Sequence, residues 1–289
     1  METYKKARSD TSDRAFLYVY IRTTPVHLFQ VKTIALIIGI CFLAGALASG
    51  FACRKDSSRL AAAMLPPVDT LPDVPADTTS DTTTHTYLAL GDSYTIGQSV
   101  LPSDRYPVQT AALLQQDHLT CAAPEIIATT GWTTTDLLNA LAAGPPDLTR
   151  ITPAQPYSVV TLLVGVNNQY QGRPQSEYGD QFAQLLRQSI RLTGNRASHV
   201  IVLSIPDYSV TPFAHGHNTD LIAAQIDSFN AINAKLSMDY QVHYLDITGE
   251  SRKAAVDVSL IASDGLHFSG KEYAIWAQKL EPMIKEIWK

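Results

Sequence analysis

The stretch YLALGDSYTIGQ, residues 87–98, opens the part of the chain whose pattern decides the fold. Four residues that suit a buried strand lead into a Gly-Asp-Ser turn, and a helical pattern follows. The same order of apolar run, loop and helix recurs to the C-terminus, which predicts an α/β fold with a mostly parallel five-stranded sheet between two helical layers. Strands are predicted at 87–90, 125–129, 158–164, 199–204 and 241–246, and helices at 106–117, 134–142, 176–193 and 219–237.

A further helix is predicted at the C-terminal end of the chain. Ser269-Gly270-Lys271-Glu272 fits a capping box, in which the first and last side chains each satisfy the other's backbone N–H. Pro282 is expected to kink this helix or to begin a separate final turn. The helix carries an apolar stripe that faces the core: Tyr273, Trp276, Leu280, Ile284 and Ile287.

Composition limits the classes of function. The chain has 289 residues, 45% of them hydrophobic, and a formal charge of −5 without any block of Lys and Arg. Nucleic acid is therefore not an expected partner, because phosphate binding needs clustered cations. Three cysteines are too few and too scattered for a disulfide framework or a zinc site, so no metal or other cofactor is expected. No repeat or second linker follows residue 86, which predicts one domain over 87–289.

Residues 33–53 contain no charged side chain and end in small residues before Cys53. This layout is typical of a secretory signal, and Gly50-Phe51-Ala52-Cys53 resembles a bacterial lipobox, although Gly50 stands where Leu is usual. Three interpretations are open: a lipoprotein lipidated at Cys53, an uncleaved single-pass membrane anchor, or a secreted protein. Basic residues outnumber acidic ones in 1–32, six to three, so the rest of the chain is expected on the extracytoplasmic side.

The segments on either side of the apolar run are predicted to lie outside the folded domain. Residues 1–32 form a leader longer than a signal needs, and one hypothesis is that translation starts near Val31. A peptide from 1–30 found by mass spectrometry contradicts that hypothesis. Residues 54–86 are rich in Pro, Asp and Thr and have little to bury, so they are predicted to form a disordered linker.

Chemically useful residues follow the predicted strands and precede the last helix. In a parallel sheet these loops meet at one edge, outside the carboxyl ends of the strands. Acyl transfer needs a nucleophile, a base, an orienting group and oxyanion donors, and this set is present. Ser93 is the candidate nucleophile, His267 its base and Asp264 the carboxylate that orients the base. The candidate oxyanion donors are the N–H groups of Ser93 and Gly131 and the side chain of Asn167.

Each of these residues also has a structural interpretation. Gly131 can be present because the backbone needs a positive φ angle there. Asn167 can cap a helix or hold a turn, and Asp264 can form an Asx turn. His267 can be an interfacial histidine. The catalytic interpretation is favoured because four separate loops all carry the residue types that acyl transfer needs, in the right order along the chain.

These motifs resemble those of the SGNH hydrolases of the GDSL esterase/lipase superfamily. The matching blocks are Gly91-Asp92-Ser93, Gly131, Gly165-x-Asn167 and Asp264-x-x-His267, and the similarity extends over about 87–288. The resemblance implies a flavodoxin-like α/β/α sandwich, a triad of Ser93, Asp264 and His267, and an oxyanion hole completed by Gly131 and Asn167. The third block often ends in Asp, whereas Asn168 stands here, so a charged pair at that place is not expected.

The resulting expectation is an extracytoplasmic serine esterase that hydrolyses esters or thioesters of modest size. One alternative is a carbohydrate O-deacetylase of the same fold, and a second is a non-catalytic binding lipoprotein. Expected partners are a small ester or an acylated carbohydrate or lipid, and a membrane reached through the N-terminal segment. Residues 206–218 wall the pocket or merely pack on the domain, and Tyr170, Gln171 and Arg173 are candidates for substrate contact. His215 and His217 lack an evident third metal ligand, and Cys121 is expected to be a buried thiol.

Overall fold

The computed structural model describes residues 83–144 and 155–289. The predicted leader 1–32, the apolar segment 33–53 with Cys53, and nearly all of the linker 54–86 lie outside the described residues. Within the described ranges, none of the helices combines the length and the hydropathy needed to cross a bilayer.

Five parallel strands form one sheet in the order β2-β1-β3-β4-β5. All five predicted strands are confirmed, and no observed end differs from the predicted one by more than two residues. The difference arises because pairing with a neighbour decides where a strand ends, and the sequence pattern does not show that pairing. Their bounds are β1 Tyr87–Gly91, β2 Glu125–Ala128, β3 Val159–Leu163, β4 Val200–Leu203 and β5 His243–Leu245.

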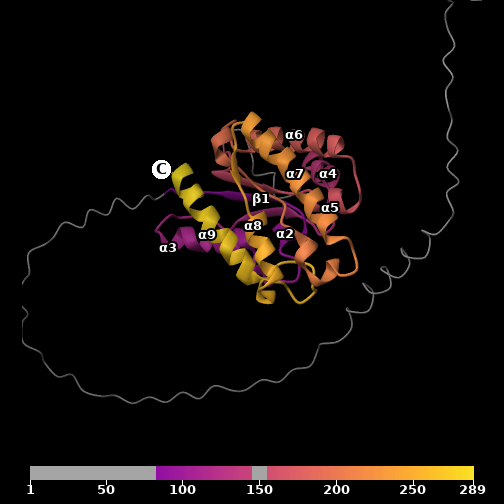
Figure 1. Cartoon of the computed structure of the whole chain (residues 1–289). Helices are drawn as coiled ribbons and strands as arrows, with labels where there is room; N and C mark the ends of the chain where they lie inside the picture. Colours follow the sequence, from indigo (N-terminus) through magenta and orange to yellow (C-terminus); the bar gives the residue numbers. More distant parts are fainter. Residues whose placement is uncertain (1–82, 145–154) are drawn as a thin grey trace, which may run out of the picture. The chain divides into compact units, whose positions relative to one another are not determined.

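Helices cover both faces of this sheet (Figure 1). Helices α3 (Tyr106–Gln116) and α9 (Gly270–Ile287) pack side by side on one face. Helices α4 (Thr134–Ala143), α6 (Gln175–Leu192) and α7 (Thr219–Asp239) lie on the other. The predicted three-layer α/β/α sandwich is therefore confirmed. Short helices that the sequence pattern did not indicate stand at strand ends: α2 Ser93–Ile96, α5 Val166–Tyr170 and α8 Thr248–Ser251.

Helix α9 differs from parts of its prediction at Pro282 and at its N-terminal cap. Of the two alternatives expected at Pro282, a kink or a separate final turn, the second is excluded because the helix continues through the proline to Ile287. Buried side chains on either side of the proline, Leu280 and Ile284, hold both halves against the core and offset the lost backbone hydrogen bond. The predicted capping box is only half formed. The Ser269 hydroxyl accepts from the Glu272 backbone N–H, but the Glu272 carboxylate binds the indole of Trp276 instead of the cap.

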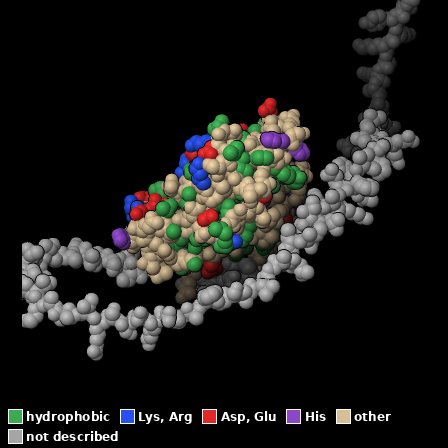
Figure 2. Space-filling model, turned by 90° about the horizontal axis from the view of Figure 1, so that it is seen from below, with side chains coloured by type: hydrophobic (Ala, Val, Ile, Leu, Met, Phe, Trp, Pro, Cys, Tyr) green, Lys and Arg blue, Asp and Glu red, His purple; other side chains and the backbone are tan. Residues whose placement is uncertain are grey.

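The core fills both sides of the sheet, because every residue of β1, β3 and β4 is buried. Cys121 is a buried free thiol, as expected. Figure 2 shows one face of the molecule, on which Lys and Arg side chains lie beside Asp and Glu and form no continuous basic patch.

The strand order reverses between β1 and β3, since the chain leaves β1 to form β2 on one side and returns to form β3 on the other. In open α/β sheets the crevice at such a reversal is where ligands bind, outside the carboxyl ends of the strands. Ser93 follows β1 and Asn167 follows β3, so both stand at this crevice.

Candidate active site

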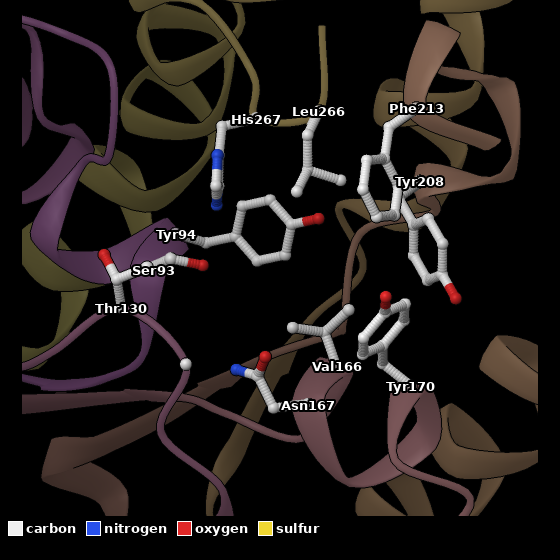
Figure 3. Close-up of a pocket in the computed structure, with 11 residues that line it drawn as sticks. Ser93, Tyr94, Thr130, Val166, Asn167, Tyr170, Tyr208, Phe213, Leu266 and His267 are labelled. Carbon is white, nitrogen blue, oxygen red and sulfur yellow. The ribbon is translucent and has the colours of Figure 1, made fainter. Parts of the chain in front are cut away.

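A pocket of about 160 Å³ lies at this crevice (Figure 3). The four loops that carry the motifs meet there, as the sequence predicted, and a fifth segment around residues 208–213 joins them. Most of the wall is apolar, and the polar groups gather at one end. The lining residues are Ser93, Tyr94, Thr130, Gly131, Val166, Asn167, Tyr170, Tyr208, Phe213, Leu266 and His267.

Ser93 is the first residue of α2, directly after β1. Asp92 caps this helix: its Oδ1 accepts from the backbone N–H of Tyr94 at 3.1 Å. The cap fixes the turn that presents Ser93 to the pocket, where Figure 3 shows its hydroxyl facing the cavity. As the first residue of a helix, Ser93 has a backbone N–H without an intrahelical acceptor, so this group is free to bind an anion.

Asp92 is itself fully buried. Burial raises the pKa of its carboxyl group to about 7, against the opposing effect of backbone N–H groups of Tyr94, Gly165 and Asp92 itself. No described residue hydrogen-bonds to its Oδ2. Near neutral pH this carboxyl is therefore partly protonated, and the negative charge beside Ser93 is present in only part of the molecules.

His267 and Asp264 form the predicted pair. The Nδ1 atom of His267 lies 2.6 Å from Oδ2 of Asp264, and the imidazole reaches into the pocket beside Ser93 (Figure 3). Oδ1 of Asp264 accepts from the backbone N–H groups of Leu266 and His267, each at 2.9 Å. The Asp264 side chain thus makes an Asx turn and orients the imidazole at the same time. The contacts expected from both sequence interpretations are therefore present at this residue.

The ionised form of Asp264 is favoured. Partial burial acts to raise its pKa, but hydrogen bonds from the Ser99 hydroxyl, from two backbone N–H groups and from His267 together lower it to about 2. A carboxylate that stays charged above this pH accepts from Nδ1–H of the neutral imidazole and leaves Nε2 free to take a proton. No hydrogen bond joins Ser93 Oγ to His267 within the described ranges, and in enzymes without substrate this contact is often long.

Asn167 lies across the pocket from His267 (Figure 3), and Gly131 also lines the pocket. Gly131 has a φ of +87°, and a Cβ added there meets no atom within 4 Å. Its backbone conformation, rather than lack of space, is what requires glycine. Asn167 Nδ2 donates to the carbonyl of Trp132 at 2.9 Å. One amide hydrogen is used in this bond, which holds the loop of Gly131, and the second is available to the pocket.

Asn168 has a structural task. It is buried, its Oδ1 accepts from Thr134 N at 3.0 Å, and its Nδ2 donates to Thr134 Oγ1 at 2.7 Å. These bonds fix the start of α4 to α5 without any charge. The amide thus replaces a charged pair with hydrogen bonds, which agrees with the expectation from the sequence.

Of the other residues that the sequence singled out, some line the pocket and others do not. Tyr208 and Phe213 line the pocket, so the segment 206–218 forms part of its wall, and Tyr170 joins them. Arg173 pairs with Glu177 in the first turn of α6 and is not among the lining residues. Histidines 215 and 217 belong to no cluster of three or more metal-ligating side chains in the described part of the chain.

Two contacts of the His267–Asp264 pair were missed from the sequence. Tyr94 stacks edge-on against His267, with ring centroids 5.6 Å apart, and forms part of the wall. Ser99 Oγ donates to Asp264 Oδ2 at 2.6 Å. A strand-helix pattern carries no signal for either contact, because each joins the segment after β1 to the loop before α9.

A family model for the GDSL-like lipase/acylhydrolase family matches residues 89–275. No curated protein matches the sequence. Solved structures with the same fold include a lipase from a goat rumen metagenome (18% identity, 69% of this chain and 97% of that one, TM-score 0.55). Another is a lipase/acylhydrolase of Enterococcus faecalis (16%, 70% and 96%, TM-score 0.54). A third is an acetylxylan esterase of Geobacillus stearothermophilus (18%, 69% and 94%, TM-score 0.52).

The family match covers more than half of the chain and includes all four motif blocks. The structural neighbours share the sheet and helices around which these blocks converge. The chain therefore belongs to the GDSL-like lipase/acylhydrolase family, and the prediction of a GDSL-type serine esterase is confirmed at the level of that family.

Proposed function

We propose that this protein hydrolyses carboxylic esters through an acyl-enzyme on Ser93, with His267 as general base and Asp264 as its orienting carboxylate. The observation that carries the proposal is the 2.6 Å contact between His267 Nδ1 and Asp264 Oδ2 beside a pocket that also holds Ser93. This contact fixes the tautomer whose Nε2 accepts a proton.

The reaction has two halves. The Ser93 hydroxyl attacks the substrate carbonyl carbon while His267 Nε2 takes its proton. The tetrahedral oxyanion is bound by the N–H groups of Ser93 and Gly131 and by the amide of Asn167. The intermediate then collapses, and the imidazolium protonates the departing alcohol. Water then enters, gives a proton to His267 and attacks the acyl carbon. The bond between this carbon and Ser93 Oγ breaks, His267 returns the proton to Oγ, and the carboxylic acid leaves.

Pocket size supports a small acyl group. A cavity of about 160 Å³ with a largely apolar wall suits a short acyl chain, and esters or thioesters of modest size fit this description. We expect turnover to fall steeply as the acyl chain outgrows the cavity. A series of p-nitrophenyl esters from acetate to laurate measures this directly.

A second candidate is a carbohydrate O-deacetylase, and one observation favours it. Tyr170 and Phe213 stand at the pocket with 59% and 40% of their surfaces exposed, and their ring centroids are 6.0 Å apart. Exposed aromatic faces beside a small acyl pocket can stack on a sugar ring. Release of acetate from acetylated xylan or peptidoglycan, without release of fatty acid from lysolipid, favours this candidate. The opposite result favours the lipid or glycerol ester.

We also propose that the domain acts outside the cytoplasm, tethered to a membrane through Cys53. The uncharged run 33–53, the basic excess before it and the lipobox-like GFAC support this. Metabolic labelling with a fatty acid, with Cys53→Ser as the control, tests it. Label that persists in the Cys53→Ser variant contradicts lipidation, and membrane retention without label supports the uncleaved anchor.

The decisive test of the chemistry uses Ser93→Ala. We expect p-nitrophenyl acetate turnover to vanish while the fold, followed by circular dichroism, is unchanged. Turnover equal to that of the unmodified protein eliminates Ser93 as nucleophile. Lack of turnover in the unmodified protein on every ester tried favours the binding lipoprotein.

A further inference from the structure

The turn that follows α2 connects the candidate nucleophile to two other parts of the site. Its first residues are bonded back to the nucleophile itself, since the N–H groups of Gly97 and Gln98 both donate to the Ser93 carbonyl. The side chains of Gln98 and of the following residue, Ser99, each bind a loop that is more than thirty residues away in the sequence. We refer to residues 97–99 as the strap.

Ser99 binds the carboxylate of the His-Asp pair. Its Oγ donates to Asp264 Oδ2 at 2.6 Å, the same oxygen that lies 2.6 Å from His267 Nδ1. The other oxygen, Oδ1, is held only by backbone N–H groups of Leu266 and His267, which belong to the same loop as Asp264. Among the described residues, Ser99 is thus the hydrogen-bond partner of this carboxylate that comes from outside its own loop.

Gln98 binds the loop that carries Gly131. Its Oε1 accepts from the hydroxyl of Thr130 at 2.6 Å, and Thr130 is the residue directly before Gly131. Two successive side chains of the strap therefore hold the base loop and the oxyanion loop. Because the strap is itself hydrogen-bonded to the Ser93 carbonyl, it connects the base loop and the oxyanion loop to the backbone of Ser93.

The backbone at Ser99 is unfavourable for a serine. Its φ is +67°, in the left-handed region where glycine or asparagine is the usual residue. A glycine would relieve this conformation, but it has no hydroxyl group to offer Asp264. The side chain is also exposed, so burial does not explain the serine.

We propose that Ser99 is a positioning residue. It holds the Asp264 carboxylate in place, and through this carboxylate it orients the His267 imidazole towards Ser93. This inference rests on the proposed function, since it assigns Ser99 a task in the same reaction. Ser99 does not touch the reacting atoms. Its effect on the rate acts through the orientation of the base.

The test uses three substitutions at this position in the full-length protein, with p-nitrophenyl acetate as substrate. Ser99→Gly and Ser99→Ala both remove the hydroxyl, and only Gly relieves the backbone, whereas Ser99→Thr keeps the hydroxyl. We expect kcat to fall about tenfold in both Gly and Ala variants, as for loss of a hydrogen bond to a charged group. KM should stay within about twofold, because the base acts in the transition state. Ser99→Thr should keep more of kcat than Ser99→Ala, although its β-branched side chain strains the left-handed backbone further.

Thermal unfolding separates positioning from stability. Ser99→Gly should melt above Ser99→Ala because of its relaxed backbone, although the two share the same loss of kcat. Ser103→Ala is the matched control, since Ser103 is a nearby exposed serine whose hydroxyl binds only Asp104, and its kcat should be unchanged. Loss of kcat that follows melting temperature across the variants overturns the inference.

A double-mutant cycle tests the route through Asp264. In an Asp264→Asn background, Ser99→Gly should change kcat by less than about twofold, because its partner carboxylate is already lost. The full tenfold effect in that background contradicts the inference.

Failure of the inference and failure of the proposed function are distinguishable. If Ser99→Gly equals the unmodified protein while Ser93→Ala is inactive, only the assignment of Ser99 fails. If Ser93→Ala is fully active, the proposed function fails and the assignment of Ser99 fails with it.

Discussion

Substitution of Asn167 by alanine is the most informative single change for the oxyanion hole. Asn167 Nδ2 has two hydrogens, and one of them binds the Trp132 carbonyl at 2.9 Å. The other is proposed to bind the oxyanion. Asn167→Ala removes this donor and also releases the loop that carries Gly131, so two of three donors are affected.

The expected magnitude follows from that count. Loss of one oxyanion donor costs about 2.7–4 kcal/mol of transition-state stabilisation, or about 10²–10³ in kcat. Because the Gly131 loop is loosened as well, we expect the upper end, about a 10³-fold loss. KM should change little, since the ground-state carbonyl gains less from these donors than the oxyanion does. Asn167→Asp, which keeps the shape but adds negative charge, should be slower still.

Asn168→Ala is the matched control, because the adjacent amide is buried and binds only Thr134. Its two lost hydrogen bonds should lower the free energy of unfolding by about 2–4 kcal/mol and leave kcat within a few-fold. Both variants are assayed with p-nitrophenyl acetate and unfolded in urea. If Asn167→Ala is folded and keeps kcat within threefold, or if the two variants exchange their expected effects, the assignment of the oxyanion donor is wrong.

Three further predictions concern pH and the backbone. The pKa of Asp92 is raised from 3.8 to about 7, so the folded state holds a proton that the unfolded state releases between these values, and stability falls as pH rises through that window. Asp92→Asn should remove this loss, which melting temperatures at pH 5 and pH 8 measure. The effect of pH on stability is opposite for Asp264, because folding lowers the pKa of this carboxyl group to about 2. Its contribution to the free energy of unfolding is present above pH 4 and is lost as pH falls towards 2. Acid titration of the melting temperature should therefore show a smaller loss for Asp264→Asn over this range. Gly165 has a φ of +138°, and an added Cβ lies 2.7 Å from Ile205 Cδ1 and Tyr178 Cε2, so Gly165→Ala should lower the free energy of unfolding in urea by about 2–4 kcal/mol.

The sequence alone determined the strands and which of the loops that follow them meet at one edge of the sheet. Apolar runs bounded by loops identify strands because a sheet covered on both faces must be apolar throughout. The carboxyl ends of parallel strands share an edge, so the sequence alone predicts that Ser93 and Asn167 lie near each other. The three-residue spacing of Asp264 and His267 also sufficed for their contact, which is local in the chain.

The tertiary structure decided the contacts that join remote segments. No local pattern marks Ser99 as a partner of Asp264, because the two are 165 residues apart and their meeting depends on how the loops pack. The course of α9 through Pro282 is decided by core contacts on both sides of the proline, which outweigh its local preference to end a helix. Sequence specifies elements through short-range periodicity, whereas side-chain positions within a site depend on the packing of all the elements around it.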